Sequence, residues 1–261
     1  SGVLPALDIG QNLSSTTGAT AFAGGVVASW GAEAASLTST DPKFNLVKWN
    51  VHKMQGYTQA SNELVADSAI GIESLLTALF GRAIASMEDY AFLNGTGAGE
   101  PLGILNADCA IGVTTTTNDQ FKIEDAMKMY SQFQSVGGSP VWILNPALVP
   151  DLYSYFQVGT SGTDFIQPRE GVPMSLLGYP ILLSEHMPAA NSDDALLVDL
   201  AAYLILDRAG LAIAYSEHAA FTTDQATWRF TKRLDGQPWL RTYITLADGS
   251  HTVSPFVYHN D

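Results

Sequence analysis

A long run of helical periodicity that starts at Ile72 limits the possible folds more than any other feature of the sequence. Apolar residues recur there every three or four positions, which is the spacing of an amphipathic helix. They are Ile72, Leu75, Leu76, Leu79, Phe80, Ala83, Ile84, Met87 and Ala91. We expect Asp67 or Ser68 to cap the start and Gly95 to stop the end. A helix of about 26 residues spans roughly 39 Å, against a mean helix of about 11–12 residues. The pattern therefore predicts a structural spine.

The segment before this helix has the period-two alternation of a β-strand over residues 43–61. Its apolar members are Phe44, Leu46, Trp49, Val51 and Tyr57. Together with a strand-like stretch at 22–30 and an Asp41-Pro42 turn, it predicts a long β-hairpin over residues 22–62. A two-stranded hairpin is marginal alone in water, so we expect it to rest on another surface. Residues 1–21 are rich in Gly, Ser and Thr and predict an extended arm with little structure of its own.

Beyond the long helix, strand-like and helical stretches alternate. We expect a helix at Ile123–Gln134, a buried strand at 140–146, a short helix at Asp151–Phe156 and further strands between 178 and 210. This alternation predicts a compact α/β unit over residues 112–218. Residues 219–261 predict strands around a hairpin turn at Asp235-Gly236. We expect these late strands to pair with the early ones and close a discontinuous domain.

Residues 92–106, FLNGTGAGEPLGILN, raise the question of a phosphate-binding loop. A dinucleotide fingerprint needs G-x-G-x-x-G between a strand and a helix N-terminus. Here the glycine spacing is different, and the loop follows a helix C-terminus, which favours cations over phosphate. There is also no G-K-[ST] sequence of a P-loop. The stretch therefore favours a structural turn.

The other candidates for chemistry do not form a catalytic pattern. The Ser-Glu-His sequence occurs at Ser184–His186 and at Ser216–His218, but without the nucleophile elbow G-x-S-x-G. Cys109 has no neighbouring His or cation to lower its pKa and is expected to be a small buried filler. The histidines, His52, His186, His218, His251 and His259, show no metal-ligand spacing. We therefore predict no catalytic, cofactor-binding or metal-binding residue, and a chain that is not an enzyme.

The charge balance argues against nucleic acid as a tightly bound partner. Lys and Arg total 12 against 26 Asp and Glu, a net charge of −14, so strong binding of DNA or RNA is not expected. Charged residues are only 15% of the chain, below the usual share of about 25%, which suggests a surface that meets other subunits.

The single cysteine indicates a reducing or indifferent compartment. No apolar run is long enough for a membrane span, and no signal peptide is expected. Because the sequence starts at Ser1, we expect it to begin partway along a longer precursor.

The order of segments along the chain resembles the major capsid proteins of tailed bacteriophages, which have the Hong Kong 97-type shell fold. Five stretches between Lys48 and Glu217 carry the resemblance. They are KWNVHKMQGYTQASNELVADSAIGIESLL, MEDYAFLNGTGAGEPLGILN, VWILNPALVPDLYSYF, LLGYPILLSEHMP and DLAAYLILDRAGLAIAYSE. Each stretch is weak alone, but the shared order is specific.

This resemblance implies an α+β capsid fold divided into five segments. They are an N-terminal arm (1–21), an extended β-hairpin loop (22–62), the spine helix and junction loop of a peripheral domain (63–111), an axial α/β domain (112–218) and peripheral strands with the C-terminus (219–261). The hairpin would overlap a neighbouring subunit, and the loop at 159–171 would lie near the capsomer centre.

The same resemblance implies a homo-oligomer of hexamers and pentamers in an icosahedral virion shell that encloses double-stranded DNA without specific binding. It implies assembly in the host bacterial cytoplasm, with no membrane and no cofactor. Decoration, portal and scaffolding proteins would be further partners.

Some members of this fold join subunits by an isopeptide bond between a lysine at the tip of the hairpin and an asparagine in the late strands of the peripheral domain. Lys43 would be the lysine, but no asparagine occurs between Asn191 and Asn260. We therefore expect a shell held together without covalent links. Two other interpretations stay open: an encapsulin-like protein compartment shell with the same fold, and, more remotely, an α/β enzyme with a glycine-rich loop.

Overall fold

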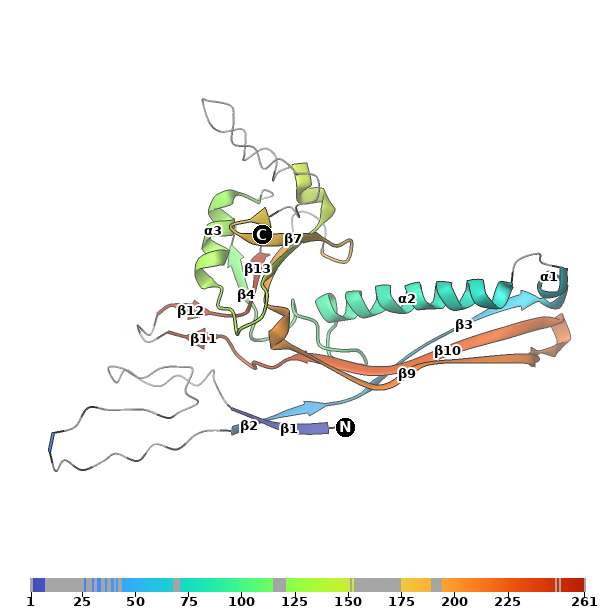
Figure 1. The fold of residues 1–261 in the computed structure, drawn as a ribbon, viewed down its shortest axis with the longest axis horizontal. Coiled ribbons are helices and arrows are strands. Elements are labelled where there is room, and N and C mark those ends of the chain that lie inside the picture. The colour runs from blue at the N-terminus through green and yellow to red at the C-terminus, as the bar shows by residue number, and fades with distance from the viewer. Residues whose placement is uncertain are drawn as a thin grey trace. The chain divides into compact units, whose positions relative to one another are not determined.

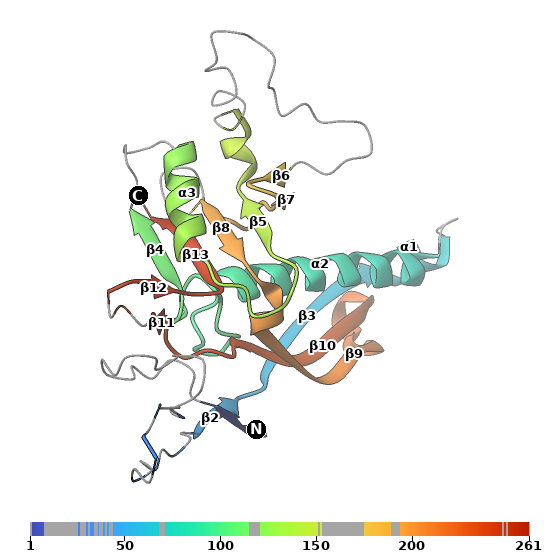
Figure 2. The ribbon, with the colours of Figure 1, turned by 60° about the vertical axis from the view of Figure 1, so that its left-hand side comes forward.

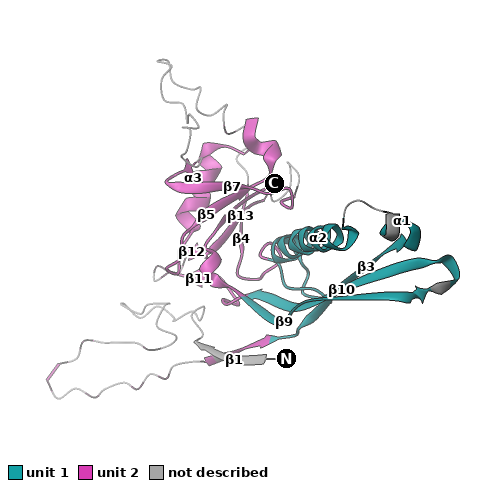
Figure 3. Ribbon diagram, turned by 45° about the vertical axis from the view of Figure 1, so that its right-hand side comes forward, with its two compact units in different colours: residues 1–2, 49–103, 205–237 teal, residues 3–48, 104–204, 238–261 magenta. Residues whose placement is uncertain are grey.

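The computed structural model describes residues 2–7, 44–67, 71–114, 121–150, 175–188, 194–246 and 250–260, with a few single positions outside these ranges. Helices and strands are mixed, and the chain divides into two compact units, coloured separately in Figure 3. Unit 1 contains residues 1–2, 49–103 and 205–237, and unit 2 contains residues 3–48, 104–204 and 238–261. The chain therefore passes between the units several times.

Unit 1 consists of the long helix α2 (Ile72–Asn94) and a three-stranded sheet beside it (Figure 1). The strand order is β3 (His52–Ser61), β10 (Gln225–Pro238) and β9 (Tyr203–Ala220). A short helix, α1 (Asn62–Asp67), follows β3 directly. The antiparallel pairing of β10 with β3 confirms that late strands pair with early ones.

Aromatic packing and one ion pair hold α2 on this sheet. Phe80 of α2 forms a buried cluster with Ala226 and Trp228 of β10, and its ring centroid lies 4.9 Å from that of Phe230. Near the other end of the helix, the Lys232 ammonium lies 2.5 Å from the Glu88 carboxylate. Each large apolar side chain buried this way contributes about 1.5–3 kcal/mol.

The long helix begins later than the sequence indicated. Its N-cap is Gly71, and the Ser74 hydroxyl donates a hydrogen bond to the Gly71 carbonyl, so the expected caps Asp67 and Ser68 are wrong. Asp67 instead ends the separate helix α1. The helix is 23 residues long and stops at Asn94, with Gly95 directly after it as predicted.

Unit 2 is built on a six-stranded mixed sheet, seen in Figure 2. Its order is β4 (Ile111–Thr114), β13 (Phe256–Asn260), β8 (Ala195–Val198), β5 (Val141–Leu144), β7 (Tyr179–Leu183) and β6 (Ser175–Leu176). The pairs β13–β4 and β5–β7 are parallel, whereas β13–β8, β5–β8 and β6–β7 are antiparallel. A small ribbon of β11 (Ile244–Thr245) and β12 (Thr252–Val253) also belongs to this unit.

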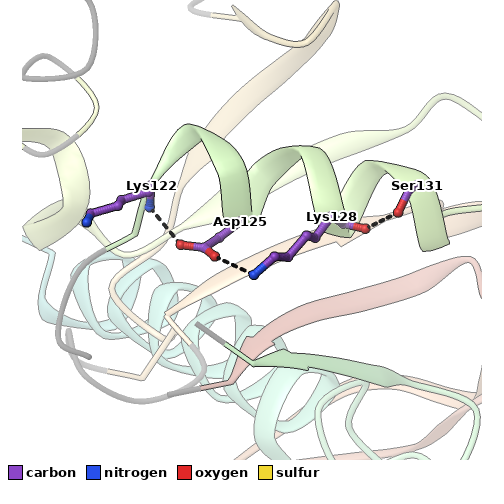
Figure 4. Close-up of polar contacts among 4 residues, drawn as sticks. All are labelled: Lys122, Asp125, Lys128 and Ser131. Carbon is purple, nitrogen blue, oxygen red and sulfur yellow. Dashed lines mark hydrogen bonds and ion pairs between the residues drawn. The ribbon is translucent and has the colours of Figure 1, made fainter. Parts of the chain in front are cut away.

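Helix α3 (Ile123–Gln132) covers part of this sheet and contacts β4 and β13. It is two residues shorter than the predicted helix and buries Ala126 and Met129 in the core. The buried Asp125 carboxylate accepts the Lys122 backbone N–H at 3.2 Å and lies 3.4 Å from the Lys128 ammonium (Figure 4). Because the first N–H groups of a helix lack internal partners, this capping box fixes where α3 begins.

The last strand differs from the expected grouping of residues 219–261. Residues up to 237 belong to unit 1, but β13 lies in the sheet of unit 2, between β4 and β8. Likewise, residues 205–218 belong to unit 1 and not to the expected α/β unit. The physical reason is that strand pairing between distant segments depends on tertiary packing, which the local pattern does not encode.

The predicted hairpin turn at Asp235-Gly236 is wrong, because β10 runs through both residues. The buried Asp235 carboxylate accepts hydrogen bonds from the backbone N–H groups of Asn50 and Gly236. The chain turns earlier, at Phe221–Asp224, where Asp224 adopts a left-handed φ of 51°. Asp is one of the residues that tolerates this conformation, and the Asn62 side chain bonds to its carboxylate.

The N-terminal arm also differs from expectation, because Gly2–Leu7 forms strand β1, paired with β2 (Phe44–Trp49) in a two-stranded sheet. A strand with Pro5 is tolerated at a sheet edge, where no donor is needed. Most of residues 8–43, including Lys43, and most of 151–171 lie outside the described residues, so the predicted hairpin tip, the short helix and the loop at 159–171 are untested.

Asp199 ties together a turn of unit 2 and gives a testable pH dependence. Its carboxylate accepts hydrogen bonds from the Ser135 hydroxyl and from the N–H groups of Val136, Gly138 and Ala201, at 2.7–3.0 Å. Burial raises the pKa of Asp199, but these bonds outweigh burial and hold its pKa below the usual value of 3.8. A carboxyl with a lowered pKa stabilises the fold above its unfolded pKa, and this contribution is lost as pH falls through the folded pKa.

We therefore expect Asp199→Asn to lower the free energy of unfolding at pH 7 by about 1–2 kcal/mol. Urea unfolding of both proteins from pH 7 to pH 3 should show the difference shrink once pH falls below 3.8. A difference that stays constant across this range would show that the charge of Asp199 does not stabilise the turn.

Candidate functional site

The glycine-rich loop follows α2 directly and is folded by its own contacts. Gly97 and Gly99 have φ values of 77° and 86°, which glycine adopts without steric cost. Gly95 needs to be glycine for a different reason: a Cβ there would lie 2.2 Å from the Pro101 carbonyl oxygen. The structural turn predicted from the sequence is confirmed.

Most of the backbone N–H groups in this loop already have acceptors. The N–H of Thr96 donates to the Glu100 carboxylate at 2.9 Å. Further N–H donors in the loop are bonded to carbonyl or hydroxyl oxygens, namely Gly95, Gly97, Ala98, Leu102 and Gly103. A phosphate site needs free N–H groups and no nearby anion, so this arrangement argues against a nucleotide cradle.

The remaining sequence candidates have structural roles. In both Ser-Glu-His stretches the serine hydroxyl accepts the histidine backbone N–H, at 3.3 Å, for Ser184 with His186 and for Ser216 with His218. Each is a local contact of the serine hydroxyl with the histidine backbone and not with the imidazole ring, so it is not a nucleophile–base pair. Cys109 is 1% exposed, and burial raises the pKa of its thiol to about 12, which makes it unreactive.

A buried polar pair in unit 2 was not indicated by the sequence. His259 at the end of β13 and Asp194 before β8 are both buried, with 2.7 Å between His259 Nδ1 and Asp194 Oδ1. Because a carboxylate only accepts, the ring donates from Nδ1. The ring also packs edge-on against Phe121, at 5.1 Å between centroids. Its position in the core indicates a structural pair.

Among the described residues, no group of three His, Cys, Asp or Glu side chains is placed to hold a metal ion. Within the same part of the chain, no helix is long and apolar enough to cross a membrane.

In unit 1, part of the apolar surface of α2 is exposed to solvent, which indicates a contact with another protein. Of the predicted apolar face, Phe80, Ile84 and Ala91 are buried. The other half, which we call the outer stripe, is exposed to solvent and consists of Leu75, Leu79, Ala83 and Met87. Leu75, Leu79 and Met87 are 49%, 47% and 54% exposed. The apolar face of the helix is thus wider than the surface that its own chain covers.

Strand β9 adds to this exposed apolar surface. Its odd-numbered residues lie on the sheet face toward α2, because the Tyr215 ring packs 5.1 Å from Trp228 and Asp207 lies 3.9 Å from Lys232. On that face Ile205, Leu211, Ile213 and Tyr215 are exposed. Exposed apolar surface on both elements is typical of a site of contact with another protein.

Comparison with known proteins agrees with this interpretation. The structure is similar to the capsid of a native GTA particle, with a TM-score of 0.70 and 20% identity over 89% of this chain and 80% of that chain. It is also similar to a structure from Mycobacterium phage Adephagia, with a TM-score of 0.67 and 14% identity over 99% of this chain and 84% of that chain. A structure from Gordonia phage Cozz gives a TM-score of 0.63 and 14% identity, over 99% of this chain and 80% of that chain.

These similarities confirm a mixed α+β capsid fold. Among curated proteins, none matches the sequence. The phage capsid family, however, matches residues 2–248, which is nearly the whole chain. The fold and the exposed apolar surface agree with this match. The chain therefore belongs to the phage capsid family, whose members are structural proteins of bacteriophage capsids.

Proposed function

We propose that this chain is the major shell subunit of a tailed double-stranded DNA bacteriophage and has a structural rather than an enzymatic role. Copies would assemble as hexamers and pentamers into an icosahedral shell around the genome, inside the host cell. The observation that carries the proposal is the outer stripe of α2. Covering each of its large side chains would stabilise the assembly by about 1.5–3 kcal/mol, before the costs of association.

The parts of the subunit also receive proposed roles. Unit 1, with α2 as the spine, corresponds to the peripheral domain, and the sheet of unit 2 corresponds to the axial domain. Residues 22–62 would be the extended loop that overlaps a neighbouring subunit, with residues 1–21 as the N-terminal arm. Val26, Trp30, Phe44 and Leu46 support this assignment, because each is at least 45% exposed in the single chain.

Expression of the chain should give closed shells tens of nanometres across in negative-stain microscopy. Boiling these shells in denaturing detergent should release monomers of 27.9 kDa, because no asparagine for an isopeptide bond occurs between Asn191 and Asn260. A protein that stays monomeric at every salt concentration would contradict the proposed function, and a ladder of covalent multimers would contradict only the non-covalent assembly.

The contents of native particles distinguish a virus shell from a compartment shell. Double-stranded DNA inside particles would support the phage capsid, whereas an enzyme cargo without DNA would identify an encapsulin-like compartment.

A further inference from the structure

Strand β9 lies at an edge of the three-stranded sheet of unit 1, beside β10 (Figure 1). The sheet order β3–β10–β9 pairs one side of β9 with β10, and within the described residues no strand pairs with its other side. β9 is 18 residues long, against a mean strand of about 5–6 residues. Its open side therefore presents a long row of backbone N–H and C=O groups, which is a template for pairing with another chain.

The middle of β9 lacks the side chains that usually protect an edge strand. Natural edges are blocked by charged residues, above all lysine, or by proline. Residues 209–215, AGLAIAY, contain no charged residue and no proline, and each of them is exposed. A long, exposed and apolar edge of this kind favours association with another strand.

The side chains of this stretch are arranged symmetrically about Ile213. On the face toward α2, Leu211 and Tyr215 lie two residues before and two residues after it. On the opposite face, the small residues Ala212 and Ala214 lie on either side of it. An interface between two identical strands related by a two-fold axis has to be self-complementary. The symmetric pattern of large and small residues meets this requirement.

We infer that β9 pairs antiparallel with β9 of a second copy of this chain, with Ile213 on the two-fold axis. The inference rests on the proposed function and identifies the strand that one of its subunit contacts uses. A chain with a net charge of −14 repels its own copies, so two copies approach at the lowest cost where the surface carries no charge. The uncharged stretch 209–215 is such a place.

The proposed register pairs the exposed apolar side chains with one another. With the axis at Ile213, Leu211 faces Tyr215 of the second copy, Ile213 faces its own equivalent, and Tyr215 faces Leu211. Apolar pairs of this kind, directly opposite on one face, are the unit that stabilises a sheet. All three side chains are 38–48% exposed in the single chain, so the pairing covers surface that the subunit leaves open.

Neighbouring registers are less favourable. An axis at Ala212 sets Asp207 against Glu217 of the second copy, and like charges directly opposite each other destabilise a sheet. An axis at Ala214 sets Leu211 against the Glu217 carboxylate and loses an apolar pair. The charges at the ends of the stretch therefore select the proposed register.

The symmetry of the pairing also suits a closed shell. A two-fold axis that relates two antiparallel strands of one sheet runs perpendicular to that sheet. The face of β9 that is turned toward α2 therefore lies on the same side in both copies. A shell wall needs the inner and outer sides of its subunits to stay the same across each contact, and this pairing keeps them so.

Thiol cross-linking of assembled shells tests the pairing and its register. In Ile213→Cys the two thiols face each other across the axis, where opposed Cβ atoms are about 4.5–5.5 Å apart. A short bis-maleimide should join them, and a denaturing gel should show dimers. In Ala209→Cys each thiol faces Glu217 of the other copy, so the two thiols are roughly 26 Å apart at about 3.3 Å per residue and only monomers are expected. Cys109 is 1% exposed and does not react.

The outcomes of this test separate the possible failures. Intact Ile213→Cys shells that give no dimers would overturn the inference and leave the proposed function standing. Thiols that are shielded from a monofunctional maleimide in the shell, but form no dimers, would show that a different occupant covers the edge and would also overturn it. A wild-type chain that never forms particles would contradict the proposed function itself.

Lysine substitutions provide a second test with a matched control on the same face of the same strand. Ile213→Lys places two lysines against each other on the axis and should lower the yield of shells by about tenfold or more. The Ile213 side chain is 38% exposed, so the melting temperature of the unassembled protein should stay unchanged. Ala209→Lys should assemble like the wild type, because its lysine faces Glu217 of the second copy. Equal yields of shells from the two variants would show that β9 does not pair in this way.

Discussion

Replacing Gly95 with valine is expected to abolish the folded state of unit 1. A Cβ at this position would lie 2.2 Å from the Pro101 carbonyl oxygen and 2.5 Å from the Ala91 carbonyl oxygen, both of which are backbone atoms. The same atoms hold the loop in place, since the Gly95 N–H donates to Ala91 and the Gly97 N–H donates to Pro101. The end of α2 and the loop therefore cannot both keep their positions.

We expect a loss of more than about 4 kcal/mol in the free energy of unfolding, measured by urea unfolding, or an insoluble protein. Gly99→Ala is the matched control, because no atom lies within 4 Å of a Cβ there and only the left-handed φ of 86° is strained. It should cost about 1–2 kcal/mol. If Gly95→Val were as stable as Gly99→Ala, the backbone at Gly95 could not lie as close to the Pro101 and Ala91 carbonyl groups as the structure shows.

Replacing His259 with alanine is the second change with a large expected effect. The Asp194 carboxylate would lose its partner in a core where both residues are at most 2% exposed. Breaking a buried pair by removing one member costs about 3–5 kcal/mol, because an uncompensated polar or charged group remains. Thermal and urea unfolding of unit 2, followed by the fluorescence of Trp142 in the same core, should show this loss.

The exposed pair of His251 and Asp248 serves as the control. Its side chains are 77% and 44% exposed, so His251→Ala should leave the free energy of unfolding nearly unchanged. Replacing both Asp194 and His259 with leucine should recover part of the loss, because no unpaired group remains. Equal losses of unfolding free energy in His259→Ala and His251→Ala would contradict the expectation that the buried pair contributes more to stability than the exposed pair.

The sequence predicted those parts of the fold that depend on local pattern. Helix α2 ends where Gly95 was expected to stop it, and residues 52–61 form a strand as predicted. The even-numbered residues of β3 are partly buried and the odd-numbered ones are exposed, including Tyr57, which the pattern had placed among the apolar residues. The glycine loop was correctly interpreted as a turn because its position after a helix C-terminus excludes a phosphate cradle. The order of the segments also indicated the capsid family.

The sequence did not predict where the strands pair. β13 lies between β4 and β8, and Asp235-Gly236 lies inside β10, although the dipeptide is a strong turn signal. In both cases distant backbone partners outweigh the local preference. The Asp194–His259 pair was missed for the same reason, because its members lie 65 residues apart and meet only when β13 enters the sheet.

The amino-acid sequence by itself determined that α2 is a long helix with a wide apolar face, because helical periodicity is a property of neighbouring residues. Only the tertiary structure decided which half of that face is buried: Phe80 packs on the sheet and Ile84 is buried, while Leu75 and Leu79 stay exposed. The physical reason is that a single sheet covers only one side of a helix. The half left uncovered is the surface on which we expect another subunit to pack.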